Sequence, residues 1–169
     1  MVTFSITMST TATSINAKEH LIKFLGQVCY LYMKDLSFIP ADKFDASPMG
    51  VARTPLNITV ECISFNDWAR RTIEGETVEM HGDFSAFNEQ FNTVEKASAG
   101  MQESTDKLVA ALSALDDEGL NRLAPVPWDP TMTVFGLAHT AATHVFYHDG
   151  QLNYIQCMLG DDKIHWMGD

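Results

Sequence analysis

The sequence feature that most constrains the fold is a row of apolar side chains, three or four residues apart, between positions 94 and 115. The row consists of Val94, Ala97, Met101, Leu108, Leu112 and Leu115, with Thr105 filling the remaining place. This spacing puts all of these side chains on one face of a helix. Because a helix buries its apolar face against other elements, the rest of the chain has to supply helices or a sheet to cover it.

Three further segments show helical spacing, and each opens with a helix-start signal. They cover positions 16–38, 55–74 and 130–158, and their start signals are Asn16 with Glu19, Thr54-Pro55 and Asp129-Pro130. We find no strand pattern and no internal repeat. The sequence therefore predicts an all-α chain in which residues 1–169 form one domain, a four-helix bundle with long connections and a loose polar arm over residues 1–13.

Composition excludes several classes of partner. The 169 residues are 46% hydrophobic, enough for one sizeable core, and the net charge is −11. That charge repels nucleic acid and an anionic membrane surface. The N-terminal residues lack a signal sequence, and no apolar run is long enough to span a membrane. We therefore expect a soluble cytoplasmic protein that binds neither nucleic acid nor membranes.

The long acidic connection over residues 76–92 is rich in phenylalanine. Phe84, Phe87 and Phe91 lie in it, and long connections in compact domains are often functional or form contacts between subunits. The sequence therefore predicts a homodimer that covers these aromatic side chains.

His144 and His148 are the leading candidates for metal binding. Four residues apart on a helix, they lie about 40° apart around its axis and one turn apart along it, so both rings can reach one ion. The same pair can also form a hydrogen-bonded core cluster without an ion. His139 lies about 180° from His148 around the same helix, and we interpret it as a surface or interface imidazole.

The three cysteines show no metal-binding or redox spacing. Cys29, Cys62 and Cys157 form no C-x-x-C pair, and each lies in an apolar helical segment. We interpret all three as buried free thiols, which burial makes unreactive. Cys62 is the least certain of them, because it adjoins Glu61.

Several short motifs together resemble a known family. They are His144-x-x-x-His148-x-Gly150-Gln151, the Pro127-Trp128 connection before it, Ile39-Pro40, the segment Thr54 to Trp68, and the turn Leu115 to Leu120. With these motifs the chain resembles the DinB/YfiT-like four-helix metalloproteins. The resemblance implies an up-down-down-up bundle, a divalent metal held by one histidine of the second helix and two of the last, and frequent homodimers. Some members of that family transfer low-molecular-weight thiols.

The chain departs from the family pattern at the first ligand. Where relatives have a histidine about seven residues before an aromatic, this chain has Glu61, seven residues before Trp68. Glutamate is itself a metal ligand, so the predicted site is Glu61, His144 and His148, holding nickel, zinc, iron or manganese. The reaction this implies is thiol transfer or hydrolysis. The alternative is a vacant site in a non-catalytic bundle that binds a small ligand or a protein partner.

Overall fold

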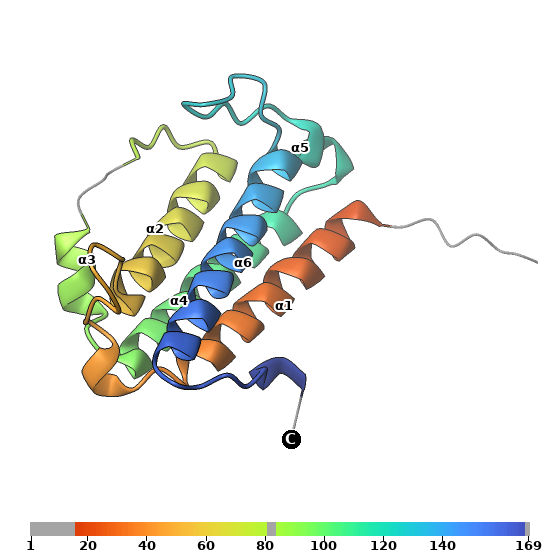
Figure 1. Ribbon diagram of the computed structural model, residues 1–169. Coiled ribbons are helices and arrows are strands. Elements are labelled where there is room, and N and C mark those ends of the chain that lie inside the picture. The colour runs from red at the N-terminus through yellow and green to blue at the C-terminus, as the bar shows by residue number, and fades with distance from the viewer. Residues whose placement is uncertain (1–15, 81–83, 168–169) are drawn as a thin grey trace, which may run out of the picture.

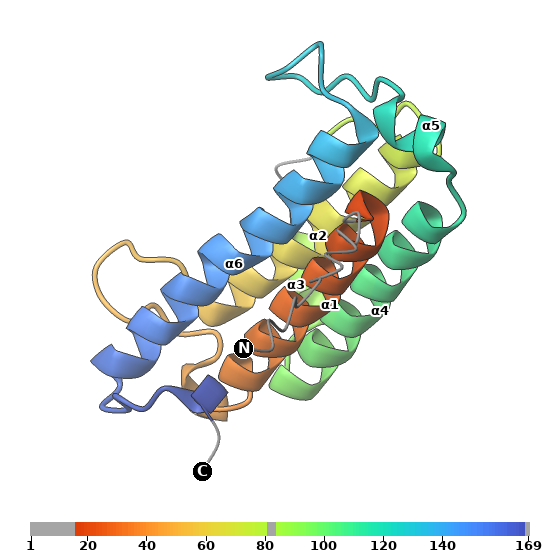
Figure 2. The ribbon, with the colours of Figure 1, turned by 90° about the vertical axis from the view of Figure 1, so that its right-hand side faces the viewer.

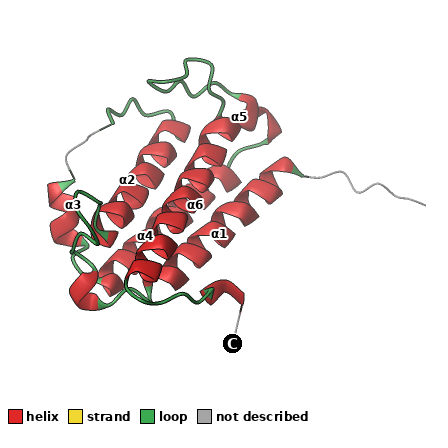
Figure 3. Ribbon diagram, in the orientation of Figure 1, coloured by secondary structure: helices red, strands yellow, loops and turns green. Residues whose placement is uncertain are grey.

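The computed structural model of the chain describes residues 16–80 and 84–167. The predicted arm over residues 1–13 and His81 of the acidic connection lie outside the described residues. Within them all regular secondary structure is helical, and Figure 3 shows helices joined by loops, with no strand among the described residues. The prediction of an all-α chain is confirmed for this part of the sequence.

Four long helices occupy the four segments that the spacing marks as helical. They are α1 (Ala17–Leu36), α2 (Pro55–Ile73), α4 (Val94–Ser113) and α6 (Val134–Met158). The shorter elements are α3 (Ser85–Gln90), α5 (Asp117–Asn121) and the 3-10 turns η1 (Ala41–Lys43) and η2 (His165–Met167).

Each long helix packs against two of the others. Helix α1 contacts α4 and α6, and α2 contacts the same two helices. Figures 1 and 2 show the four side by side, and in Figure 1 α1 and α6 run downward whereas α2 and α4 run upward. Since α2 and α6 are neighbours, polar side chains on their facing sides meet. Among the described residues, no helix is long and apolar enough to cross a membrane.

The apolar row of α4 forms part of the core, as its spacing predicts. Ala97, Met101, Leu108 and Leu112 are fully buried. Burying a side chain of leucine size stabilises the fold by about 1.5–3 kcal/mol. The polar member of the row, Thr105, is also buried, and its hydroxyl accepts a hydrogen bond from Asn66 Nδ2 of α2 at 3.2 Å. This bond satisfies the hydroxyl oxygen that the apolar row would otherwise leave unpaired.

Two predicted helix starts are confirmed by their caps. The Asn16 side chain accepts a hydrogen bond from the Glu19 backbone N–H at 3.1 Å, and Thr54 Oγ1 accepts one from the Asn57 N–H at 3.1 Å. Each bond satisfies a backbone donor that has no partner within the first helical turn. Both helices end slightly earlier than predicted, α1 at Leu36 and α2 at Ile73.

The predicted start of the last helix at Asp129-Pro130 is wrong. Helix α6 begins at Val134, where Thr133 Oγ1 accepts a hydrogen bond from the backbone N–H three residues on, at 3.1 Å. The Asp129 carboxylate instead accepts bonds from the backbone N–H and the hydroxyl of Thr131, at 2.8 and 2.7 Å. Aspartate followed by proline serves a tight turn as well as a helix start, and here the local bonds to Thr131 close a turn.

The acidic connection contains the short helix α3, and its phenylalanines pack within the chain. Phe84 and Phe87 are half-buried against the core, and Phe91 is buried in it. Gly100 of α4 leaves room for the Phe91 ring, because a Cβ at Gly100 would lie 2.4 Å from Phe91 Cε1. These rings therefore have partners within the chain, and the homodimer stays a prediction.

Candidate metal centre

Glu61 of α2 meets His144 and His148 of α6 between the two helices. His144 Nε2 lies 3.5 Å from Glu61 Oε1, and His148 Nε2 lies 3.7 Å from Glu61 Oε2. The two Nε2 atoms are 3.1 Å apart. The structure thus brings together the three residues that the sequence proposes as ligands, since one turn of α6 presents both rings to the same turn of α2.

The spacing of these atoms suits a divalent ion. With metal–ligand bonds of about 2.1 Å, ligand atoms lie about 3.0 Å apart in octahedral geometry and about 3.4 Å apart in tetrahedral geometry. The Nε2–Nε2 separation of 3.1 Å falls in this range, and the two separations from the carboxylate, 3.5 Å from Oε1 to His144 and 3.7 Å from Oε2 to His148, are slightly longer. A small movement of the carboxylate would bring one of its oxygens into range of an ion held by the two Nε2 atoms.

Hydrogen bonding orients His148 for ligation. Its Nδ1 lies 2.7 Å from Gln151 Oε1, and the Gln151 amide donates to the Tyr147 hydroxyl at 3.0 Å. An amide oxygen only accepts, so Nδ1 carries a proton, and a metal ion would bind the lone pair that Nε2 has once that nitrogen is deprotonated. Nε2 points at His144 and Glu61, and an outer hydrogen bond such as the one from Nδ1 to Gln151 is the usual support of a metal-binding imidazole.

His144 is held by stacking. The Phe65 ring of α2 lies against it, with the ring centroids 4.5 Å apart and the planes 27° from parallel. His144 Nδ1 is buried and has no hydrogen-bond partner among the described residues. His144 therefore lacks the outer hydrogen bond that Gln151 provides for His148, and the Phe65 ring is what restricts its orientation.

Glu61 is ionised and already has one cationic partner. Hydrogen bonds to His144 and His148, together with the charge of Arg53, hold the pKa of the Glu61 carboxyl well below its usual range, although partial burial opposes them. The Arg53 guanidinium forms an ion pair with Glu61 and also donates to the Asn57 carbonyl at 3.1 Å. Glu61 is therefore available as a ligand at neutral pH, but a metal ion would compete with Arg53 for it.

Cys62 is a fourth candidate ligand that the sequence analysis set aside as a buried thiol. One ligand atom each of Cys62, His144 and His148 lie within 4.8 Å of one another, so these three residues could hold a metal ion. Cys62 is buried, and its burial and the nearby Glu61 charge raise the pKa of the thiol well above its usual range. Binding through sulfur therefore requires the ion to displace a tightly held proton.

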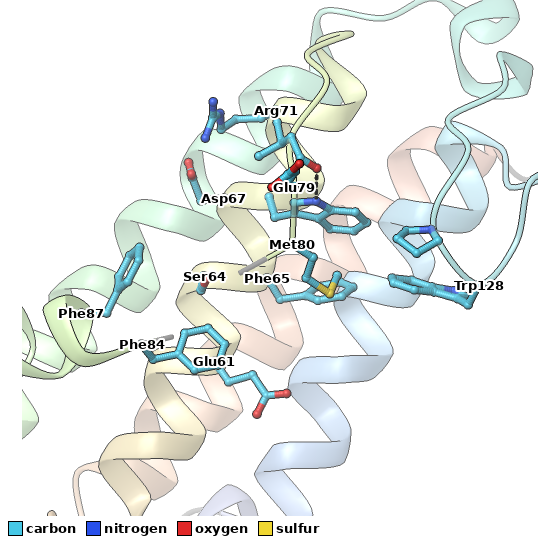
Figure 4. Close-up of a pocket in the computed structure, with 13 residues that line it drawn as sticks. Glu61, Ser64, Phe65, Asp67, Arg71, Glu79, Met80, Phe84, Phe87 and Trp128 are labelled. Atoms are coloured by element: carbon cyan, nitrogen blue, oxygen red, sulfur yellow. Dashed lines mark hydrogen bonds between the residues drawn. The ribbon is translucent and has the colours of Figure 1, made fainter. Parts of the chain in front are cut away.

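A pocket of about 500 Å³ adjoins the centre. Figure 4 shows Glu61 at one end, with Phe65, Met80 and Trp128 further along. Phe65 stacks on His144 and also lines the pocket, so its ring connects the centre to the pocket. Neither histidine lines it, so Glu61 is the residue of the centre that borders the pocket.

The remaining histidine and cysteine predictions have mixed outcomes. His139 is exposed, as expected, and its ring lies near those of Phe24 and Phe135 and not among the residues of the centre. Cys29 is buried as predicted, but the prediction that Cys157 is buried is wrong, because its side chain is exposed near the end of α6. The helical apolar context around Cys157 misled the assignment, since position 157 lies on the solvent face of that helix.

Comparison with known proteins adds no assignment. No protein-family model matches the sequence, and no curated protein matches it either. The assignment of the centre rests on its geometry and on the residues quoted above.

Proposed function

We propose that the chain is a four-helix bundle with the up-down-down-up arrangement of DinB/YfiT-like proteins, and that Glu61, His144 and His148 hold a divalent metal ion. The shared direction of α1 and α6, opposite to that of α2 and α4, supports the arrangement. The observation that carries the metal proposal is the convergence of the two Nε2 atoms and the Glu61 carboxylate within 3.1 to 3.7 Å.

The proposed activity is metal-dependent transfer of a low-molecular-weight thiol, or hydrolysis. A bound divalent ion would lower the pKa of a thiol or a water molecule and so supply a nucleophile near neutral pH. Gln151 accepts the Nδ1 proton of His148, so Nε2 is the ring nitrogen that would bind the ion. Phe65 excludes water from one face of His144, and the pocket beside Glu61 orients the molecule to be attacked.

The ligand set influences which metal is preferred. Two imidazoles and one carboxylate favour nickel, iron or manganese, and zinc is also compatible with them. If Cys62 joins the set, its soft sulfur shifts the preference towards zinc. Cys62→Ser should therefore reduce zinc affinity more than manganese affinity, whereas a centre without sulfur would lose neither.

The second candidate function is a non-catalytic bundle that binds a small ligand or a protein partner. The ion pair between Arg53 and Glu61 favours it, because the guanidinium already neutralises the carboxylate without a metal. In this case the cluster of Glu61, His144 and His148 is a hydrogen-bonded contact between α2 and α6.

Calorimetric titration with nickel, zinc, manganese and ferrous ions separates the two candidates. The parent protein should bind at least one ion at micromolar concentration, and Glu61→Gln should weaken binding at least tenfold, or about 1.4 kcal/mol. Glu76→Gln is the matched control, since Glu76 also pairs with an arginine, Arg71, but lies outside the centre. If the parent binds no divalent ion and Glu61→His gains binding, the second candidate replaces the first.

A further inference from the structure

The pocket beside the metal centre has an aromatic wall made by Phe65, Trp68 and Trp128. The ring centroids of Phe65 and Trp68 are 5.4 Å apart, those of Trp68 and Trp128 5.7 Å, and those of Phe65 and Trp128 6.4 Å. The Trp68 indole N–H donates to the Val78 carbonyl at 3.1 Å, so this indole has no donor left for a ligand. What Trp68 offers a bound molecule is the aromatic ring itself.

Met80, Phe84 and Phe87 extend the apolar lining on the other side (Figure 4). A pocket of about 500 Å³ with such walls has the size and character of a site for a small organic molecule.

The charged groups of the pocket are predominantly acidic. Glu61, Asp67 and Glu79 line it, and Arg71 is the only cationic side chain among its described lining residues. Arg71 Nε already donates to Glu76 Oε2 at 2.7 Å, so its charge is offset by a carboxylate outside the pocket. Glu61 and Asp67 are likewise paired, with Arg53 and Arg70, so Glu79 is the lining carboxylate without an ion-pair partner among the described residues. An anionic ligand would find no uncompensated cation among the lining residues, whereas Glu79 and the net charge of −11 favour a cation.

We propose that this pocket binds a hydrophobic organic cation, a molecule with an apolar or aromatic body and an ammonium group. The body packs between Met80 and the aromatic wall, and the cation lies near the ring faces and the Glu79 carboxylate. Aromatic faces attract cations within about 6 Å of the ring centroid, and Trp does so most strongly. The inference rests on the proposed function only for what reaction such a molecule would undergo, because the pocket does not need a metal to bind it.

The three indole N–H signals in a nuclear magnetic resonance spectrum provide the test. Phenyltrimethylammonium is the cationic probe, tert-butylbenzene its neutral isostere and benzenesulfonate its anionic counterpart, each titrated into chelator-treated full-length protein. The cation should shift the signals of Trp68 and Trp128 and leave that of Trp166 in place, because Trp166 lies near Asp35 and away from the pocket. It should bind at least about ten times more tightly than benzenesulfonate, with weakening at high salt.

Two variants locate the binding. Trp128→Ala should reduce the affinity for phenyltrimethylammonium at least about fivefold, as read from the Trp68 signal, because it removes the most accessible ring of the wall. Phe135→Ala is the matched control, an exposed aromatic on α6 that does not line the pocket, and it should leave the affinity unchanged. Glu79→Gln should lower the preference for the cation over tert-butylbenzene.

Other outcomes would overturn the inference. Equal or tighter binding of benzenesulfonate or tert-butylbenzene would show that the pocket does not select a cation. Shifts of all three indoles, or of none, would show that there is no specific site. Metal titration is a separate measurement. If the protein binds the organic cation but no metal, the proposed function fails and this inference stands. If it binds a metal but does not select the cation, this inference fails and the proposed function stands.

Discussion

Helix α6 contributes to two polar clusters, one on each of two sides. One cluster adjoins a pocket and the other is closed off from solvent. The open cluster is Glu61, His144 and His148, which lies beside the pocket. The closed cluster is Asp35 of α1 with Asp149 and Gln156 of α6, all buried. Residues 148 and 149 are adjacent in sequence, so their side chains point about 100° apart, one towards α2 and the other towards α1.

In the closed cluster, side chains of α6 and of the C-terminal segment donate hydrogen bonds to Asp35. Asp35 Oδ2 accepts hydrogen bonds from Asn153 Nδ2 at 2.7 Å and from Trp166 Nε1 at 2.6 Å, and the Asp35 carbonyl accepts one from Gln156 Nε2 at 2.7 Å. Burial, followed by the neighbouring Asp35, raises the pKa of Asp149 to about 8. Asp149 therefore keeps its proton at neutral pH, while Glu61 in the open cluster has lost its own.

The difference suggests separate roles for similar residues. The closed cluster joins α1 to α6 and retains a proton inside the fold, which is a structural role. The open cluster leaves lone pairs directed at one point next to a pocket, which is what binding requires. The predictions below test this division.

The largest expected effect is a dependence of stability on pH that separates the clusters. Asp149 binds its proton more tightly in the folded state, so the free energy of unfolding should fall as pH rises between the ordinary value of 3.8 and about 8. We expect a loss of about 3–4 kcal/mol between pH 5 and pH 8, measured by urea unfolding. One proton sets an upper limit of about 1.4 kcal/mol per pH unit on the slope.

Glu61 acts in the opposite sense and in another window. Its pKa is lowered by folding, so its contribution is present above the ordinary value of 4.5 and lost as pH falls below it. Asp149→Asn should remove the pH dependence of the free energy of unfolding between pH 3.8 and about 8. Glu61→Gln should remove the pH dependence below pH 4.5. If Asp149→Asn leaves the pH dependence above pH 3.8 unchanged, Asp149 does not hold a proton in the folded state.

The next effect distinguishes structure from function. Asp35→Ala should lower the free energy of unfolding by about 2 kcal/mol, because it leaves the Trp166 indole N–H and one N–H of Asn153 without their acceptor. It should not change metal affinity. His144→Ala should do the reverse, abolishing metal binding at a cost of about 1 kcal/mol or less in stability. A comparable loss of stability in both variants would contradict the division.

Two glutamines on α6 give a matched pair. Gln151→Ala removes the acceptor that fixes His148 Nδ1, and we expect metal affinity to fall about tenfold with little change in stability. Gln156→Ala removes a bond of the closed cluster, so it should lower stability by about 1 kcal/mol and leave metal affinity intact. Calorimetry gives the metal affinity of each variant, and urea unfolding gives its free energy of unfolding. A loss of stability in Gln151→Ala together with a loss of metal affinity in Gln156→Ala would refute the assignment of the glutamines.

The smallest effect concerns thiol reactivity. Iodoacetamide at neutral pH should modify the exposed Cys157 at an ordinary rate and leave Cys29 and Cys62 intact, because burial raises the pKa of both buried thiols. Mass spectrometry of peptides identifies the modified residue. Rapid modification of Cys62 would show that solvent reaches the thiol beside the open cluster and would weaken the case for a metal-centred reaction.

The sequence predicts the helices better than the contacts between them. The spacing from Val94 to Leu115 places α4 within two residues at its C-terminal end, since a helical face is a local pattern. The His144 and His148 pair is local in the same way. Glu61 was found through resemblance to a family motif and not by periodicity, because no local rule states which residue of another helix will face a given turn.

The parts that sequence reasoning missed depend on the rotation of each helix within the packed structure. Cys62 follows Glu61 directly, yet its proximity to both histidines becomes evident only when α2 and α6 are placed together. Asp35 and Asp149 pair across the core although neither stands in a motif. The sequence signal that points to such residues is a charge within an apolar stretch of helix, because a charged side chain is rarely buried without a partner.

The adjacency of His148 and Asp149 has a mechanical consequence. Side-chain atoms lie about 6 Å from a helix axis, so a rotation of α6 by 10° would move the His148 ring by about 1 Å. The same rotation would pull Asp149 away from Asp35, and the buried bonds of Asn153 and Gln156 to Asp35 oppose it. Contacts with α1 thus set the angular position of α6, and with it the distance at which the imidazoles stand from Glu61.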